Sequence, residues 1–210
     1  MDTIIASRNW RYATKKFDPN KKVEGQDLDV LLEATRLSAS SYGLQPYHVF
    51  VISNKELQKK LRPFSWNQAQ ITEASHLIVF ANKVRFDGAL VDNYLENVSE
   101  TRSIPHDGLK DYGDFMKSKL LSLTDTDKGI WTAKQVYLAL GNLLNAAAEL
   151  RIDTCPIEGF EPEKYNEILG LDEKGLNATV AVALGYRSED DVTQHYKKVR
   201  YSKEELFTHL

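Results

Sequence analysis

The sequence is poor in cysteine: Cys155 is the only one among its 210 residues. A single thiol cannot form a disulfide within the chain, and it cannot supply the several thiolate ligands of a cysteine-based metal cluster. This scarcity is compatible with a reducing compartment. Because Cys155 lies beside an apolar run, we expect it to be a buried, inert residue and not a redox-active one.

Long apolar runs and an excess of either charge are also missing. No stretch approaches the ~18 apolar residues of a membrane span, and the short apolar run after Asp2 does not suit a signal peptide. The net charge is −3, from 27 basic and 30 acidic residues, which gives no indication of nucleic-acid binding. We therefore predict a cytoplasmic protein with one domain over residues 1–210, and neither a membrane nor a nucleic acid as partner.

The signatures of common nucleotide, metal and hydrolase sites are absent from the sequence. No G-x-G-x-x-G run follows a strand, and the glycine pairs 108/113 and 170/175 lack the lysine and hydroxyl residue of a phosphate loop. No two of the five histidines have the i, i+4 spacing of a helical zinc site, and no G-x-S-x-G motif exists. We predict no metal site, and any redox cofactor must be held without the usual nucleotide motif.

Helical and strand patterns are mixed along the chain. We predict helices over 2–9, 26–38, 54–61, 67–73, 127–150 and 161–169, with 87–122 largely helical and interrupted at Pro105 and Gly108. Apolar, β-branched runs predict three strands, at 48–52, 76–81 and 178–184. Trp131 and Tyr137 are expected to pack in the core along the long helix. Few strands and no βαβ alternation predict an α+β fold, with helices around one modest sheet.

Two basic segments carry residue types that suit a phosphorylated ligand. Residues 11–17 contain Arg11, whose guanidinium offers a bidentate fork for phosphate oxygens. In an extended segment Lys198 and Arg200 would fall on one face, where two cations could meet a phosphate dianion. The alternatives are a solvated basic loop and a solvated basic tail.

Two further segments suit the remainder of such a ligand. Residues 37–47 place small hydroxyl side chains between a helix and a strand, where they could hold phosphate or sugar-alcohol oxygens. In residues 155–160, Pro156 stiffens the backbone and Gly159 allows it to approach a planar ligand. The alternatives are an ordinary helix-to-strand loop and a strand end followed by a turn.

The order and content of these motifs together resemble the oxygen-insensitive, enteric-type branch of the nitroreductase family. The motifs are Arg11-x-x-Thr14-Lys15-x-Phe17, Ser40-Ser41 followed by Gln45-Pro46, Asn67 before a short helix, Trp131-x-x-Lys134-Gln135-Val136-Tyr137, Pro156-Ile157-Glu158-Gly159-Phe160 and Lys198-x-Arg200. The resemblance extends from about residue 8 to residue 201 and is weakest over 84–126.

This resemblance implies a three-layer α+β fold, with a central, mostly antiparallel sheet flanked by helices, in an intertwined homodimer. It implies an oxidoreductase with tightly bound FMN, NAD(P)H as a transient hydride donor, and two sites at the subunit interface. A ping-pong cycle would pass the electrons to a small-molecule acceptor such as a nitroaromatic or a quinone. The alternatives are flavin or dihydropteridine reduction, flavin binding with little turnover, and an interaction protein without a cofactor.

The resemblance also implies which residues bind the cofactor. Arg11, Lys198 and Arg200 correspond to the phosphate contacts. Lys15 corresponds to a lysine beside the flavin pyrimidine ring, where its charge would stabilise the reduced flavin, and Asn67 to an asparagine at the pyrimidine edge. No side chain is assigned as a catalytic acid or base, because the cofactor itself accepts and donates the hydride.

The other implied positions line the flavin ring and its ribityl chain. They are Ser40, Ser41 and Tyr42, in part from the partner subunit; Pro156, Ile157, Glu158 and Gly159, with a backbone N–H of Glu158 or Gly159 near the flavin N5; and Tyr12, Ala13 and Gln70. The chain departs from its relatives at Tyr12-Ala13, where His-Ser is usual, and at Gly43-Leu44, where Asn-Ser is common.

The neutral side chain at position 70 generates a prediction about the flavin. Some members of the family carry a second lysine there, and a cation stabilises the negative charge that reduction places on the flavin. We therefore expect Gln70 to give a lower flavin midpoint potential than in those relatives, and Gln70→Lys to raise it. A redox titration of both proteins measures the difference; no rise in the variant would contradict the prediction.

Overall fold

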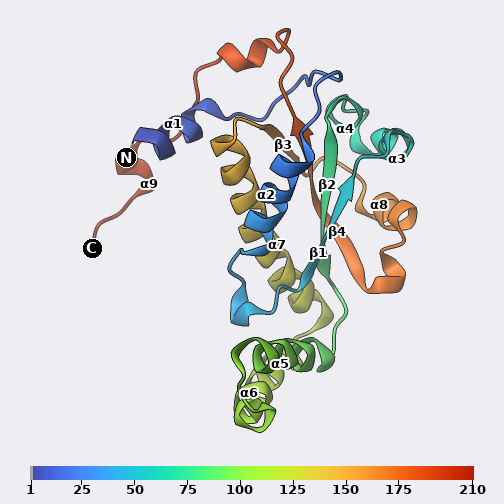
Figure 1. The fold of residues 1–210 in the computed structure, drawn as a ribbon, viewed down its shortest axis with the longest axis vertical. Helices are drawn as coiled ribbons and strands as arrows, with labels where there is room; N and C mark the ends of the chain where they lie inside the picture. Colours follow the sequence, from blue (N-terminus) through green and yellow to red (C-terminus); the bar gives the residue numbers. More distant parts are fainter. Residues whose placement is uncertain (1) are drawn as a thin grey trace.

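A four-stranded sheet forms the centre of the computed structural model, which describes residues 2–210 except for the side chain of Asp2 (Figure 1). Its strands are β1 (Tyr47–Ile52), β2 (His76–Lys83), β3 (Asp153–Ile157) and β4 (Leu176–Gly185), in the spatial order β1-β2-β4-β3. All three neighbouring pairs are antiparallel, and an isolated bridge between Ala13 and Thr154 is parallel. The predicted α+β class and mostly antiparallel sheet are confirmed.

The predicted strands are confirmed as β1, β2 and β4, but β3 is not among the predictions. Pro156 counts against a strand in the sequence, because a proline cannot donate a hydrogen bond to a neighbouring strand. The structure places β3 at an edge of the sheet, where a strand tolerates proline, and Pro156 pairs there with Val182. Of the two interpretations of residues 155–160, the strand end plus turn therefore describes the local backbone.

Helices account for most of the remaining chain. They are α1 (Asp2–Trp10), α2 (Gly25–Arg36), α3 (Lys55–Leu61), α4 (Gln70–Glu73), α5 (Ala89–Arg102), α6 (Lys110–Leu120), α7 (Asp125–Glu149), α8 (Pro162–Leu169) and α9 (Lys203–Leu206). The side chains of Asn54 and Thr124 cap α3 and α7 by accepting a backbone N–H. No helix within residues 2–210 has the length and apolar character that crossing a lipid bilayer requires.

Two helical predictions differ from the structure. The helix expected over 67–73 begins only at Gln70, because Trp66 and Asn67 adopt left-handed backbone angles, with φ of 52° and 55°. The short helix α9 was not predicted in the basic tail; a capping box between Ser202 and Glu205 starts it.

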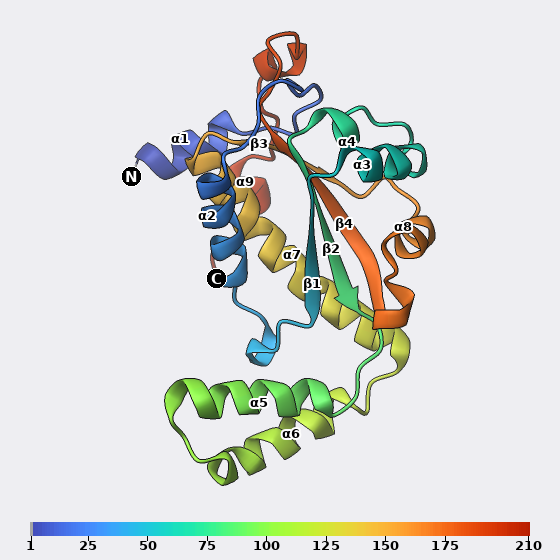
Figure 2. The same cartoon turned by 45° about the vertical axis from the view of Figure 1, so that its right-hand side comes forward.

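Helices cover both faces of the sheet and so form three layers (Figure 2). On one face α2 and α7 pack against alternate strand residues such as Phe80 and Val182. On the other face α3, α4 and α8 pack against the intervening residues, such as Val79 and Ala181. Because helices cover both faces, β2 and β4 are buried on both sides and carry continuous apolar runs, at 77–81 and 180–184.

A helical hairpin of α5 and α6 projects from one end of this body (Figures 1 and 2). It has its own small core around Leu95 and Met116, which also includes Leu44 and the partly buried Trp131. Trp131 is therefore a packing residue, as predicted. The expectation for Tyr137 is wrong, since 42% of its surface is exposed on the outer side of α7.

The end of β4 yields a prediction about stability. A Cβ atom at Gly185 would lie 3.0 Å from the backbone nitrogen of Ser75 and 3.1 Å from the Phe17 ring. We expect Gly185→Ala to lower the free energy of unfolding by about 1–3 kcal/mol, as overpacked core positions do. Gly25→Ala is the control, because the added methyl group has no atom within 4 Å apart from its chain neighbours and the backbone of its own helix. Urea unfolding compares the two variants; equal stability would contradict the prediction.

Candidate active site

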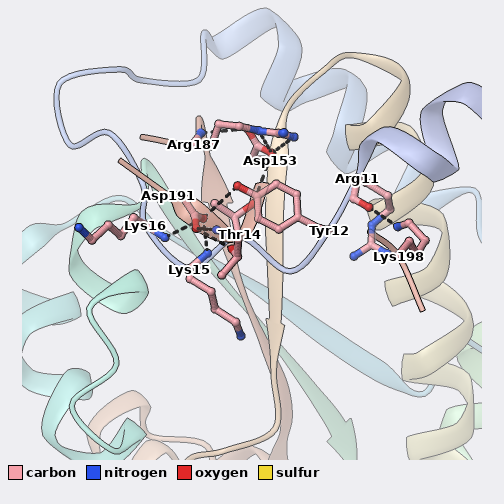
Figure 3. Close-up of polar contacts among 10 residues, drawn as sticks. Arg11, Tyr12, Thr14, Lys15, Lys16, Asp153, Arg187, Asp191 and Lys198 are labelled. Atoms are coloured by element: carbon pink, nitrogen blue, oxygen red, sulfur yellow. Dashed lines mark hydrogen bonds and ion pairs between the residues drawn. The ribbon is translucent and has the colours of Figure 1, made fainter. Parts of the chain in front are cut away.

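Three basic residues from opposite ends of the chain converge beside α7. Arg11 follows α1, whereas Lys198 and Arg200 belong to the C-terminal segment. All three line two adjoining cavities, of about 320 and 400 Å³, and the Lys198 ammonium donates a hydrogen bond to the Arg11 carbonyl oxygen (Figure 3). The structure thus brings together the three predicted phosphate contacts.

The charges of this cluster are not neutralised within the described part of the chain. Burial, together with Arg200 and Arg8, lowers the pKa of Arg11, and burial with Arg11 and Arg200 lowers that of Lys198. Among residues 2–210, none of the three cluster cations forms an ion pair, and the buried Nε of Arg11 has no hydrogen-bond partner. Buried donors are normally satisfied, so the cluster suits an anionic ligand.

The loop that carries Lys15 is fixed by the buried carboxylate of Asp191 (Figure 3). Its Oδ2 accepts the backbone N–H of Lys15 at 2.8 Å, that of Lys16 at 3.1 Å and the Tyr12 hydroxyl at 2.9 Å. Its Oδ1 accepts the backbone N–H and the hydroxyl of Thr193, at 3.0 and 2.6 Å. The Lys15 side chain leaves the loop on the side away from Asp191 and is exposed.

A second buried carboxylate holds the base of the same loop. Asp153 accepts hydrogen bonds from the Arg187 guanidinium, 2.6 Å away at the shortest, and from the Thr14 hydroxyl at 3.3 Å. The Arg187 guanidinium lies between the rings of Trp10 and Tyr12, 4.3 and 4.6 Å from their centres. Tyr12 therefore contacts Arg187 through its ring and Asp191 through its hydroxyl.

Ser40, Ser41 and Tyr42 lie elsewhere in the same chain. The Ser41 backbone N–H donates to Gln135 Oε1 at 2.7 Å, whereas Asn145 lines the cavity of the basic cluster. These two residues of α7 are about 15 Å apart along the helix axis. Figures 1 and 2 agree in placing this turn near the hairpin, at the far end of α7 from the loop before α2. Within a single chain, the Ser40–Tyr42 segment therefore does not reach the basic cluster.

The backbone of this turn is strained. Tyr42 and Gln45 have φ of 58° and 42°, values that cost energy for residues with a Cβ atom. The Gln45 side chain compensates by donating to the Arg36 carbonyl oxygen at 2.7 Å. Gln135 of the Lys-Gln-Val-Tyr motif is thus explained physically, since it fixes the turn that contains Ser41.

The Trp66 ring, which no sequence pattern singled out, lies against Gly159. A Cβ atom at Gly159 would lie 2.5 Å from the Trp66 ring, so a side chain there would displace this ring. The Gln68 amide also donates to the Gly159 carbonyl oxygen at 2.9 Å. The 66–70 segment therefore packs against the Pro156–Gly159 segment, and Asn67 and Trp66 are exposed beside it.

Cys155 lies where several predicted site residues meet. Burial raises the pKa of its thiol, whereas Lys15, Gln70 and Arg11 act in the opposite direction from nearby. Its exposed fraction is 2%, which confirms the expected burial. The thiol is thus a structural neighbour of Lys15 and Gln70, two residues that were predicted to flank the same ring.

Glu158 is exposed, and its carboxylate accepts a hydrogen bond from the Tyr137 hydroxyl. Burial and this hydrogen bond raise the pKa of Tyr137 to about 12. The contact turns the Glu158 side chain toward α7. The sequence does not indicate Trp66, Asp191 or Arg187 as residues of this region, and it predicts a core position for Tyr137 in place of this contact. An acidic pair at 190–191 is the only visible signal for Asp191.

The Asp191 carboxylate generates a prediction about acid stability. Burial raises its pKa, but the hydrogen bonds from Thr193, Lys15, Lys16 and Tyr12 outweigh this and lower it from 3.8 to about 2. A depressed folded-state pKa adds stability above the unfolded value, about 2 kcal/mol here, which is lost as pH falls toward 2. The stability difference between wild type and Asp191→Asn should therefore shrink by about 1 kcal/mol between pH 6 and pH 3.

Urea unfolding at both pH values measures this difference. Asp190→Asn is the matched control, because it removes the same charge from an exposed neighbour whose carboxylate forms no hydrogen bond within residues 2–210. A difference for Asp191→Asn that stays constant with pH would show that the charged form is not favoured by folding.

Comparison with known proteins identifies the family of this chain. The model of the nitroreductase family matches residues 9–186. A Staphylococcus epidermidis protein named "Putative NAD(P)H nitroreductase" is 39% identical, over 98% of this chain and 96% of that protein. A Bacillus subtilis protein with the same description is 37% identical, over 89% and 90%.

Solved structures share the fold at lower sequence identity. A "putative NAD(P)H:FMN oxidoreductase" of Staphylococcus epidermidis has a TM-score of 0.86 at 21% identity and covers 100% of this chain and 97% of that chain. A "putative nitroreductase in complex with FMN" of Exiguobacterium sibiricum has a TM-score of 0.83 at 18% identity, over 99% and 97%. Because the family model spans most of the sequence and relatives align along nearly its whole length, the chain belongs to the nitroreductase family.

Proposed function

We propose that this protein is an FMN-dependent oxidoreductase that takes hydride from NAD(P)H and passes electrons, in a ping-pong cycle, to a nitroaromatic, a quinone or a similar acceptor. The observation that carries the proposal is the convergence of Arg11, Lys198 and Arg200 on adjoining cavities without a neutralising partner among residues 2–210. Membership of the family supports it, as do the NAD(P)H in the relatives' names and the FMN complex of the Exiguobacterium protein.

The residues present fit this cofactor. The unpartnered Nε of Arg11 and the two cations beside it would hold the FMN phosphate by charge-assisted hydrogen bonds. FMN, when bound, supplies the hydride chemistry. Lys15 would keep a positive charge at the pyrimidine edge, and Asn67 and Gln70 would offer amide hydrogen bonds there. Gly159 has no side chain of its own, and the Trp66 ring lies in the space that a Cβ atom there would take.

A second copy of the chain completes the proposed site. The Ser40–Tyr42 turn lies too far along α7 to serve the cluster of its own chain, so we assign it to the site of the partner subunit. The segment 195–210 is exposed throughout and includes large apolar side chains, such as Phe207, which a partner would cover. Figure 1 shows this segment extending away from the body beside α1.

Spectroscopy of the purified protein tests the proposed function. The protein should take up FMN, become yellow, and lose the flavin absorbance when NADH or NADPH is added without oxygen. Addition of a nitroaromatic or a quinone should then restore it. A yellow protein that does not bleach would favour flavin binding without turnover. A protein that takes up no FMN would overturn the proposal.

The basic cluster gives a quantitative prediction for FMN affinity. A hydrogen bond between charged groups contributes about 1.5–3 kcal/mol, so Arg11→Gln or Arg200→Gln should raise the Kd for FMN about 10- to 100-fold. Arg102→Gln is the control, because it removes the same charge from the exposed end of α5. Quenching of flavin fluorescence measures the Kd values. Equal affinities in all three variants would place the phosphate elsewhere.

A further inference from the structure

We propose that Asp191 is the positioning residue of the cofactor site, and that its two carboxylate oxygens fix the distance between the cations at the two ends of the ligand. One oxygen holds the loop of Lys15, and the other starts the segment that leads to Lys198 and Arg200. The inference rests on the proposed function, and it adds a residue that does not itself touch the ligand.

The Oδ2 atom determines the direction of Lys15. Its three donors, the backbone N–H groups of Lys15 and Lys16 and the Tyr12 hydroxyl, converge on one oxygen within 3.1 Å. Two successive N–H groups aimed at one point fix the peptide planes on both sides of the Lys15 Cα atom. Because the side chain direction follows from these planes, the Lys15 ammonium leaves on the opposite side, as Figure 3 shows.

The Oδ1 atom determines the start of the C-terminal segment. It caps the short helix Val192–His195 by accepting the N–H and the hydroxyl of Thr193. The chain then runs through Tyr196 in an extended conformation to Lys198, whose ammonium returns to the Arg11 carbonyl oxygen. Asp191 and Lys198 thus close a ring of contacts around residues 11–15.

The five donors on Asp191 leave little freedom for either segment. A carboxylate has two acceptor oxygens, whereas an asparagine amide has one oxygen and an NH₂ group that only donates. In Asp191→Asn, either the Lys15 loop or Thr193 must therefore face the amide NH₂ group, which cannot accept its hydrogen bonds. The fold should survive, because the Lys16 carbonyl oxygen still accepts from the Ser188 N–H and Phe17 still bridges Arg187.

Variants on the two sides of the carboxylate should have different effects. Tyr12→Phe removes one donor from Oδ2 and loosens the Lys15 loop, so it should lower the flavin midpoint potential. Thr193→Val removes the hydroxyl donor from Oδ1, so it should raise the Kd at least fivefold with the potential unchanged. Asp191→Asn should do both, with at least a tenfold rise in Kd.

The experiment measures the Kd for FMN, the midpoint potential of the FMN-saturated protein and its melting temperature. A tenfold loss of preference for the reduced flavin lowers a two-electron potential by about 30 mV. Asp190→Asn is the matched control, since it removes the neighbouring exposed charge and should leave all three quantities as in the wild type. A purely structural role would lower the melting temperature and leave the potential and the Kd unchanged.

The possible outcomes separate this inference from the proposed function. A wild-type protein that binds no FMN overturns both. The role of Asp191 alone is overturned by a different result, in which the wild type binds and reduces FMN but Asp191→Asn changes neither quantity. In that case the Kd of the variant lies within twofold, and its midpoint potential within 10 mV, of the wild-type values. A change in both quantities that Asp190→Asn does not reproduce supports it.

Discussion

The junction between the N-terminal loop and the segment after β4 depends on two buried carboxylates. Asp153 lies in β3 and binds Arg187, while Asp191 binds the backbone of Lys15 and Lys16. Their exposed fractions are 4% and 2%, and each is saturated by donors, which is how a protein accommodates a buried charge. This junction positions the loop that contains Tyr12, Thr14 and Lys15.

The basic cluster differs from these two carboxylates, because its positive charges have no partner of opposite charge within residues 2–210. The acids near the site are used to fix the backbone, so none of them pairs with Arg11, Lys198 or Arg200 among residues 2–210. Burial, and then the repulsion between the cluster cations, lower the pKa values of Arg11 and Lys198. An anionic ligand would relieve this repulsion, and the fold holds the cations in place before it arrives.

Two regions of α7 have different roles in this arrangement. Near its C-terminal end Asn145 lines the basic cavity, and nearer its start Gln135 fixes the strained turn of Ser41. A rigid helix keeps these two regions at a constant separation. In the proposed dimer, the turn of one subunit and the cluster of the other would meet, so α7 sets the geometry of both sites.

The sequence by itself determined the elements with strong local patterns. The apolar, β-branched runs of β2 and β4 and the periodicity of α7 specify their conformation locally, and the ordered motifs indicated the family and the convergence of Arg11 with Lys198 and Arg200. Only the tertiary structure decided which residues fix the site. β3 exists because β4 offers its edge to a segment containing proline, and Asp191 matters because residues 12–16 fold back onto it. Such contacts join residues far apart in the chain, so no local pattern contains them.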